Sequence, residues 1–409
     1  MKVDDLSVHA LLYSVHHDSL RALWIEDEDR REVVLCRTDE FLHEADALRE
    51  ELGRTFEVAI GRMPLLNRFM TTWGRMLVPA EIRAHPPDVL VVVPHALVHD
   101  LPLHLVVTDI GGPLGTVCGI AYCSGMTLFQ RCASRNPLRR LDLDTWRFEE
   151  EAAPRGHRTG RTLRVGGVDV LAAHDDGFER LAAALAASFR DGEVTTVGGQ
   201  DQEGASWMRP MRLDRRFVLS QFDAHRESLV DRGPDVLCIV AHGDLDLERH
   251  QLSGLLLAAP PRGIGLHKVD FTVDGKRVRR TLLPLRVAPP VNTALVTEVL
   301  TAAELELSGT SSSELVCLLG CSAGSGRLLQ ADEPASLAES FLKLGSPSVV
   351  APMWDAHVDA TYEWMACFFE AWIQRGKPKA LAGRDATAEV STRYGPERAG
   401  VLTLRGDWL

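Results

Sequence analysis

The chain has 409 residues, of which 45% are hydrophobic and 25% are charged, and this balance is typical of a globular protein with a sizeable core. The formal net charge is −12 and basic residues are mixed with acidic ones, so we expect no direct nucleic-acid partner. No segment approaches the roughly 20 apolar residues of a membrane-spanning helix. Asp4 and Asp5 stand where a secretory signal would need basic residues, so we expect a cytoplasmic protein with no membrane partner.

The first 60 residues alternate like strands and then become helical from Asp39 to Leu52, with four apolar residues near one face: Phe41, Ala45, Leu48 and Leu52. An amphipathic stretch from Pro64 to Leu77 follows. The continuous β-branched run Val89 to Val93 then predicts a strand buried on both faces, as in a parallel sheet. We therefore expect residues 1–132 to form N-terminal strands, helices and the first strands of a sheet.

Residues 133–165 are rich in Arg, Pro and acids and lack periodicity, which predicts an exposed linker or insertion. In residues 166–409 strands alternate with helices, two of them expected at 178–189 and 216–229, and this predicts a mostly parallel, doubly wound sheet with helices on both faces. Asp274-Gly275 predicts the turn of a β-hairpin inserted at 260–290. A strand from Glu314 to Leu319 and a helix from Pro334 to Leu344, ended by Gly345, follow.

The eight cysteines include no C-x-x-C pair, and several lie in apolar runs. In a chain of this length that pattern predicts reduced thiols in a cytosolic protein rather than a disulfide framework or a zinc site. We expect neither a metal nor another cofactor.

Two predicted strands end in reactive side chains. DVLCIVAHGD ends in His242-Gly243, and ELVCLLGCSAG ends in Gly320-Cys321. Ligands bind at the carboxyl ends of the strands of an open parallel sheet, so these side chains could face one scissile bond. An imidazole can favour the thiolate and then protonate the departing amine. The backbone N–H groups of Gly243 and Cys321 would bind the oxyanion.

Other readings stay open at this point. A cysteine after an apolar strand is often only buried, and a histidine at a strand end is often only hydrogen-bonded. Residues 320–324 also satisfy the G-x-S-x-G pattern of serine hydrolases, with Ser322 as nucleophile and Asp355, His357 and Asp359 downstream. A nucleophile elbow passes directly from strand to helix, however, whereas the next predicted helix begins about ten residues later. Cys321 is therefore the favoured nucleophile.

Four segments stand out together, in this order: VLVVVPHALVHDLPLHLV, DVLCIVAHGD followed by LSGLLL, LVCLLGCSAG, and SVVAPMWDAHVDATYEWMACFFEAWIQRGKPKAL. They resemble successive blocks of the CHAT family of caspase-like cysteine peptidases, which are related more distantly to separase. The resemblance implies an α/β fold, a caspase-like three-layer sandwich, with a catalytic dyad of His242 and Cys321. It also implies cleavage of a specific protein substrate, an activating or recruiting protein, and a role in regulated bacterial defence or cell death.

The caspase signature Q-A-C-[RQG]-G is absent, because Leu319-Gly320 precedes Cys321, so cleavage after Asp gains no support. In the resembling fold the strand after the nucleophile ends beside the S1 pocket, which implies Trp354 and Asp355 as pocket residues. Asp355 could favour Arg or Lys at P1, or it could cap the following helix or face water. The helical repeats that often recruit substrates in this family are missing, so the alternative function is a catalytically weak or inactive caspase-like regulatory binding module.

Overall fold

The computed structural model describes residues 6–27, 29–53, 63–135, 313–319 and 334–409 without a break. Shorter pieces are described at 140–141, 148–149, 163–167, 194–198, 236–240, 242–244, 254–258, 267–273, 276–282, 297–307 and 327–328. The helices predicted at 178–189 and 216–229 lie outside the described residues.

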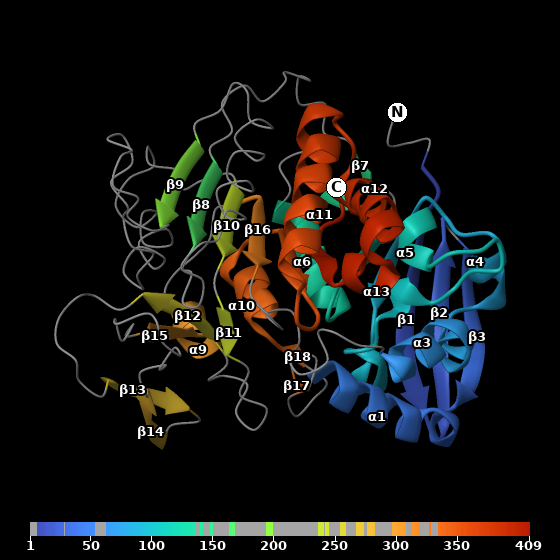
Figure 1. Cartoon of the computed structure of the whole chain (residues 1–409). Coiled ribbons are helices and arrows are strands. Elements are labelled where there is room, and N and C mark those ends of the chain that lie inside the picture. The colour runs from blue at the N-terminus through green and yellow to red at the C-terminus, as the bar shows by residue number, and fades with distance from the viewer. Residues whose placement is uncertain are drawn as a thin grey trace.

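One sheet of eleven strands forms the centre of the molecule, in the order β3-β2-β1-β4-β5-β20-β19-β16-β10-β8-β9 (Figure 1). The strands are β1 Val8–His16, β2 Ser19–Glu26, β3 Asp29–Arg37, β4 Val89–Val93, β5 Gly119–Tyr122, β8 Leu163–Gly167, β9 Val194–Gly198, β10 Val236–Val240, β16 Leu315–Leu319, β19 Ser348–Pro352 and β20 Leu402–Gly406. Neighbours pair antiparallel at β1–β2, β2–β3 and β19–β20, and in parallel elsewhere in this sheet. The predicted mostly parallel sheet is confirmed.

The sheet changes direction in its middle. Because β19 and β20 pair antiparallel, the parallel set β1, β4, β5 and β20 runs opposite to the parallel set β19, β16, β10, β8 and β9. The carboxyl ends of the two sets therefore lie at opposite edges of the sheet. β20 also joins the N-terminal strands to the rest through β5, so one sheet spans both halves of the chain.

Helices cover both faces of the sheet. On one face, α11 (Val358–Phe369) and α12 (Lys379–Tyr394) pack on a core that includes alternate residues of β4, β10 and β16. On the other face, α1 (Leu42–Gly53) and α3 (Pro64–Thr71) cover the N-terminal strands. The same face carries α6 (Met126–Arg135) and α10 (Leu337–Leu344) over β10, β16 and β19. This arrangement is the predicted three-layer sandwich.

The period-2 side-chain alternation of the strands explains the two cores. In β4, Val89, Val91 and Val93 enter the first core, whereas Leu90 and Val92 enter the second. All five side chains are buried, so the predicted strand with two covered faces is confirmed. The predicted apolar stripe is also confirmed, because its four residues are buried: Phe41, directly before α1, and Ala45, Leu48 and Leu52 on α1.

The helix predicted from Pro334 begins later than expected. Pro334 belongs to the two-residue strand β18 (Pro334–Ala335), and α10 begins at Leu337. The Ser336 hydroxyl accepts a hydrogen bond from the Glu339 N–H at 3.2 Å, which caps the helix at that residue. Gly345, with a φ of 129°, ends the helix as predicted.

The hairpin predicted within residues 260–290 is present. Strands β13 (His267–Val273) and β14 (Lys276–Leu282) pair antiparallel, and Val273 opposite Lys276 leaves a two-residue connection. In the range 133–165, α6 continues to Arg135 and two short strands pair, β6 (Arg140–Leu141) and β7 (Phe148–Glu149). Much of that range lies outside the described residues, so the division into 1–132, 133–165 and 166–409 stays a prediction.

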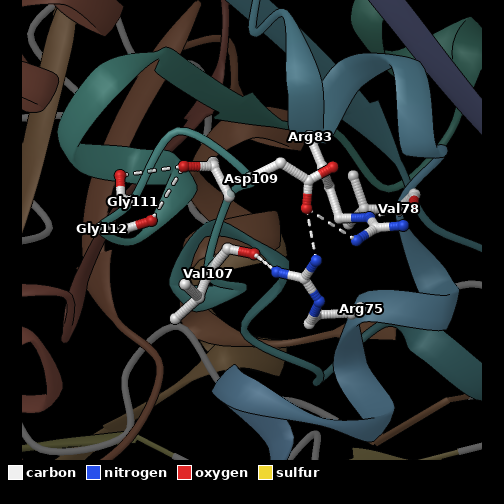
Figure 2. Close-up of polar contacts among 8 residues, drawn as sticks. Arg75, Val78, Arg83, Val107, Asp109, Gly111 and Gly112 are labelled. Carbon is white, nitrogen blue, oxygen red and sulfur yellow. Dashed lines mark hydrogen bonds and ion pairs between the residues drawn. The ribbon is translucent and has the colours of Figure 1, made fainter.

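Polar contacts fix the long connection between β4 and β5 (Figure 2). The Asp109 carboxylate accepts hydrogen bonds from Arg75, in the short helical segment Trp73–Leu77, and, at 3.2 Å, from Arg83 in α4 (Ala80–Ala84). The Thr108 hydroxyl donates to the carbonyls of the two glycines that follow, at 3.0 and 3.1 Å. The connection is thus tied to the helical layer rather than left as a free loop.

Candidate functional site

The two strands that carry the predicted dyad lie side by side. β10 and β16 pair in parallel and in register, from Val236 opposite Leu315 to Val240 opposite Leu319. Both strands are buried on both faces, and they end at the same level. Their carboxyl ends therefore lie side by side along one border of the sheet, as the sequence predicts. This border, formed by the ends of the strands, is called the candidate edge.

His242 follows β10 by two residues and begins a second sheet. β11 (His242–Asp244) pairs antiparallel with β12 (Gly254–Ala258), which places His242 opposite Leu256. β12 pairs in turn with β15 (Thr297–Thr301). Figure 1 shows β11 and β12 beyond the end of β10. The backbone of His242 and Gly243 is thus fixed by strand pairing at the candidate edge.

Cys321 follows β16 by two residues and lies outside the described residues, together with Gly320 and Ser322. For His242 and Gly243 the structure describes the backbone. The catalytic dyad of His242 and Cys321, and the oxyanion hole of Gly243 and Cys321, therefore stay predictions.

Residues 320–326, where a serine nucleophile elbow would pass into its helix, lie outside the described residues, so the choice of Cys321 over Ser322 stays a prediction. Further along the chain, strands β17 (Arg327–Leu328) and β18 pair with each other, and α10 is the first helix described after β16. His357, the histidine that a serine triad would use, instead accepts a hydrogen bond from the Ala360 N–H at 3.4 Å and caps α11. The cap of α11 is therefore His357 and not Asp355, the residue considered for that role.

The strand next to β16 leads to the predicted pocket residues. β19 pairs in parallel with β16, from Leu315 opposite Ser348 to Cys317 opposite Val350. Trp354, two residues beyond β19, is 1% exposed and stacks on the buried ring of His104, with centroids 6.4 Å apart. Asp355 is half-buried. A role of Trp354 and Asp355 in the substrate pocket stays a prediction.

The seven described cysteines are free, and six of them are buried. Burial raises the pKa of Cys36 to about 11, that of Cys132 to about 12, and that of Cys317 well above its ordinary value. Cys238 and Cys317 lie opposite each other on β10 and β16, and both are 0% exposed. Burial thus disfavours the reactive thiolate of Cys36, Cys132 and Cys317 at neutral pH.

A buried polar cluster that the sequence analysis missed lies behind Trp354. The His104 ring contacts the Tyr122 hydroxyl at 2.8 Å and the Gly400 carbonyl at 2.6 Å. Because these partners are 18 and 296 residues away along the chain, no local pattern points to the cluster.

In the part of the chain that the structure describes, no three His, Cys, Asp or Glu side chains group as metal ligands. None of the described helices is both long enough and apolar enough to span a membrane.

Two solved structures of the Saccharomyces cerevisiae separase–securin complex resemble this chain, with TM-scores of 0.53 and 0.52 and sequence identities of 9% and 8%. Each match covers 98% of this chain and 30% of the matched chain, so this chain spans less than a third of that protein's length. Porphyromonas gingivalis RgpB, in complex with its pro-domain, matches with a TM-score of 0.46 and 10% identity over 90% of this chain and 76% of its own. At identities of 9% and 8%, the likeness to the separase–securin structures shows the fold alone.

No curated protein matches this chain in sequence. The family model described as CHAT domain matches residues 63–397. This span runs from the start of α3 to α13 (Pro396–Ala399) and includes β10 and β16, the strands that lead to the proposed catalytic pair. Because that span is most of the chain, the protein belongs to the CHAT domain family and has the caspase-like fold of cysteine peptidases.

Proposed function

We propose that the chain is a cysteine endopeptidase that cleaves a specific protein partner, with His242 and Cys321 as its catalytic pair. The observation that carries this proposal is the register of β10 and β16, which ends with Val240 opposite Leu319. Neighbouring strands lie about 4.8 Å apart. The two residues of the proposed pair each follow the end of their strand by two positions, so they are expected side by side at the candidate edge. An imidazole and a thiol at that separation can act on the same peptide bond.

In the proposed mechanism His242 takes the proton of Cys321, and the thiolate attacks the carbonyl carbon of the scissile bond. The backbone N–H groups of Gly243 and Cys321 stabilise the oxyanion of the tetrahedral intermediate. His242 then gives its proton to the departing amine. A water molecule, deprotonated by the same imidazole, hydrolyses the thioester and restores the thiol.

The free cysteines support a reducing, cytoplasmic location. Seven cysteines are described, and all of them are free thiols. Proteins of oxidising compartments usually pair their cysteines. A cytoplasmic location is therefore part of the proposal.

The test is cleavage of candidate proteins, chosen from the products of neighbouring reading frames, by the purified chain. Cys321→Ala and His242→Ala should each lower kcat/KM by about a thousandfold or more, because members of a nucleophile–base unit fail together. Ser322→Ala is the matched control, since it removes the neighbouring hydroxyl and should leave cleavage intact. Unimpaired cleavage by Cys321→Ala would refute the proposal. A stable partner that wild-type protein binds but leaves intact would instead favour the regulatory binding module.

We propose further that the negative charge of Asp355 makes the site prefer Arg or Lys as the P1 residue of the substrate. Asp355 is half-buried in the segment that follows β19, one strand away from β16. A fluorogenic peptide panel varied at P1 should show a preference for basic residues that Asp355→Asn reduces. A flat profile, or a preference that Asp355→Asn leaves unchanged, would remove this part of the proposal.

We also propose a regulated role in bacterial defence or cell death, in which an activating or recruiting protein releases the peptidase. Expression of the chain in bacteria together with its activating protein should slow growth, and the Cys321→Ala variant should not. Equal toxicity of the two forms would contradict a proteolytic role in that setting.

A further inference from the structure

His104 lies in the short helical turn Leu103–Leu105 of the β4–β5 connection and is 5% exposed. Three segments converge on its ring. β5 contributes the Tyr122 hydroxyl, 2.8 Å from Nδ1, and the turn before β20 contributes the Gly400 carbonyl, 2.6 Å from Nε2. The segment after β19 contributes the Trp354 ring, which lies nearly parallel to the imidazole at an interplanar angle of 10°.

The partners fix the tautomer of His104. A carbonyl oxygen can only accept, so Nε2–H donates to Gly400 and Nδ1 has no proton. Nδ1 therefore accepts the hydroxyl proton of Tyr122, whose oxygen also accepts the backbone N–H of His104 at 3.0 Å. Every polar atom of this cluster is satisfied by the neutral ring. Burial, which lowers the pKa of His104 to about 4, keeps it neutral at physiological pH.

The cluster packs against the loop that follows β19. The Met353 N–H donates to the Val401 carbonyl at 2.9 Å, which ties the loop to the turn before β20. The buried Trp354 Nε1, by contrast, has no acceptor among the described residues. Its ring position therefore depends on packing, and His104 supplies the flat surface against it. A Cβ on Gly400 would lie 2.4 Å from Leu105 and 3.3 Å from His104 Nε2, so this turn and the ring fit closely.

We propose that His104 is a positioning residue for the substrate side of the candidate site. With Tyr122 and Gly400 it fixes Trp354, and through it the loop Met353–His357, which leaves the sheet beside the carboxyl end of β16. The β4–β5 connection would thus determine the shape of a loop on the catalytic half of the sheet. This inference rests on the proposed peptidase function for its catalytic meaning and on the described residues for its geometry.

The test uses two variants of the full chain and two measurements. His104→Phe keeps a flat ring but loses both hydrogen bonds, and Tyr122→Phe removes only the hydroxyl. Hydrogen exchange of residues 353–357 should accelerate in both variants. KM for the substrate found in the cleavage screen should rise about tenfold in His104→Phe while kcat changes less than about twofold, because the loop would contact substrate away from the reacting atoms.

His9→Phe is the matched control. His9, on β1, is also buried and contacts three side chains: Ser7 at 3.1 Å, Trp24 at 3.3 Å and Glu26 at 3.4 Å. It should leave exchange at 353–357 and KM unchanged. Unchanged exchange in His104→Phe, unchanged KM despite faster exchange, or equal effects of His9→Phe would each overturn the inference. Cleavage that survives Cys321→Ala would refute the proposed function but not this inference. The hydrogen-exchange data do not depend on cleavage, so they would still report whether His104 positions the loop.

Discussion

Alkylation of the native protein tests the assignment of the nucleophile without any knowledge of the substrate. Iodoacetamide at pH 7 should modify Cys321 and leave the seven described cysteines unmodified over the same period. The chain has eight cysteines, so the unfolded protein should take up eight groups and the native protein one. The Cys321→Ala variant should take up none.

The expected selectivity follows from burial of the other thiols. The pKa of Cys36 is raised to about 11 by burial, and the side chain is 8% exposed. At pH 7 such a thiol is roughly 0.01% thiolate, against roughly 3% for an ordinary thiol with a pKa near 8.5. Cys36 should therefore react about 300-fold more slowly than an unperturbed, exposed thiol. Cys321 should react faster still, since His242 would favour its thiolate.

Intact-mass and peptide mapping at several times would measure these rates. The most informative internal control is Cys367, which is half-buried and so the most exposed of the seven, with a pKa that burial raises. Modification of Cys367 or Cys36 as fast as Cys321 would refute the reasoning. So would an equal rate of modification in wild-type protein and in the Cys321→Ala variant.

Three further predictions concern stability. Burial lowers the pKa of His104 in the folded protein to about 4, so below pH 6.5 the ring takes up a proton in the unfolded chain before it does so in the folded one. The free energy of unfolding, measured by chemical denaturation, should therefore fall by about 3 kcal/mol between pH 6.5 and 4. The His104→Phe variant should not show this loss. Gly119→Ala would place a Cβ 2.8 Å from the backbone of α12 and should lower the free energy of unfolding by about 1–3 kcal/mol in urea titration, whereas Gly125→Ala, with nothing within 4 Å, should change it little. Lys379→Met removes a fully buried cation 3.8 Å from the Asp407 carboxylate and should cost about 3–5 kcal/mol by the same measurement; a loss under 1 kcal/mol would contradict a role for this charge.

Local patterns predicted the elements around the candidate site well. The apolar runs of β4, β10 and β16 indicate buried strands because each run is β-branched or aliphatic and short. The Asp274-Gly275 turn indicates its hairpin because few residues adopt the backbone angles that such a turn needs. These signals act within a few residues, so one sequence is enough to reveal them.

The start of α10 was misplaced although a local signal for it exists. Proline is common in the first turn of helices, and this preference wrongly favours Pro334 as the start of the helix. Ser336 and Glu339 have the spacing of a capping box, and the structure uses Ser336 as the cap. Capping residues were therefore the better guide at this position.

Contacts between distant segments could not be predicted. β20 enters the sheet between β5 and β19, and no pattern in Leu402–Gly406 specifies its neighbours. The His104 cluster depends on that same placement, because Gly400 reaches His104 only when β20 lies beside β5. Long-range pairing of this kind is set by the packing of the whole core.

The reversal of strand direction at β19 and β20 narrows the choice of catalytic residues. If all strands ran one way, His95 and His99 after β4 and Cys123 after β5 would share an edge with the residues after β10 and β16. In the described sheet, β4 and β5 run opposite to β10 and β16, so their carboxyl ends lie at the other edge. His95 and Cys123, which follow these strand ends within two residues, are thereby separated from the candidate site. The same reversal brings the turn before β20 to the edge where β19 ends, because Pro352 pairs with Leu402. The N-terminal half therefore meets the candidate edge through the amino ends of its strands, which can shape a substrate loop there.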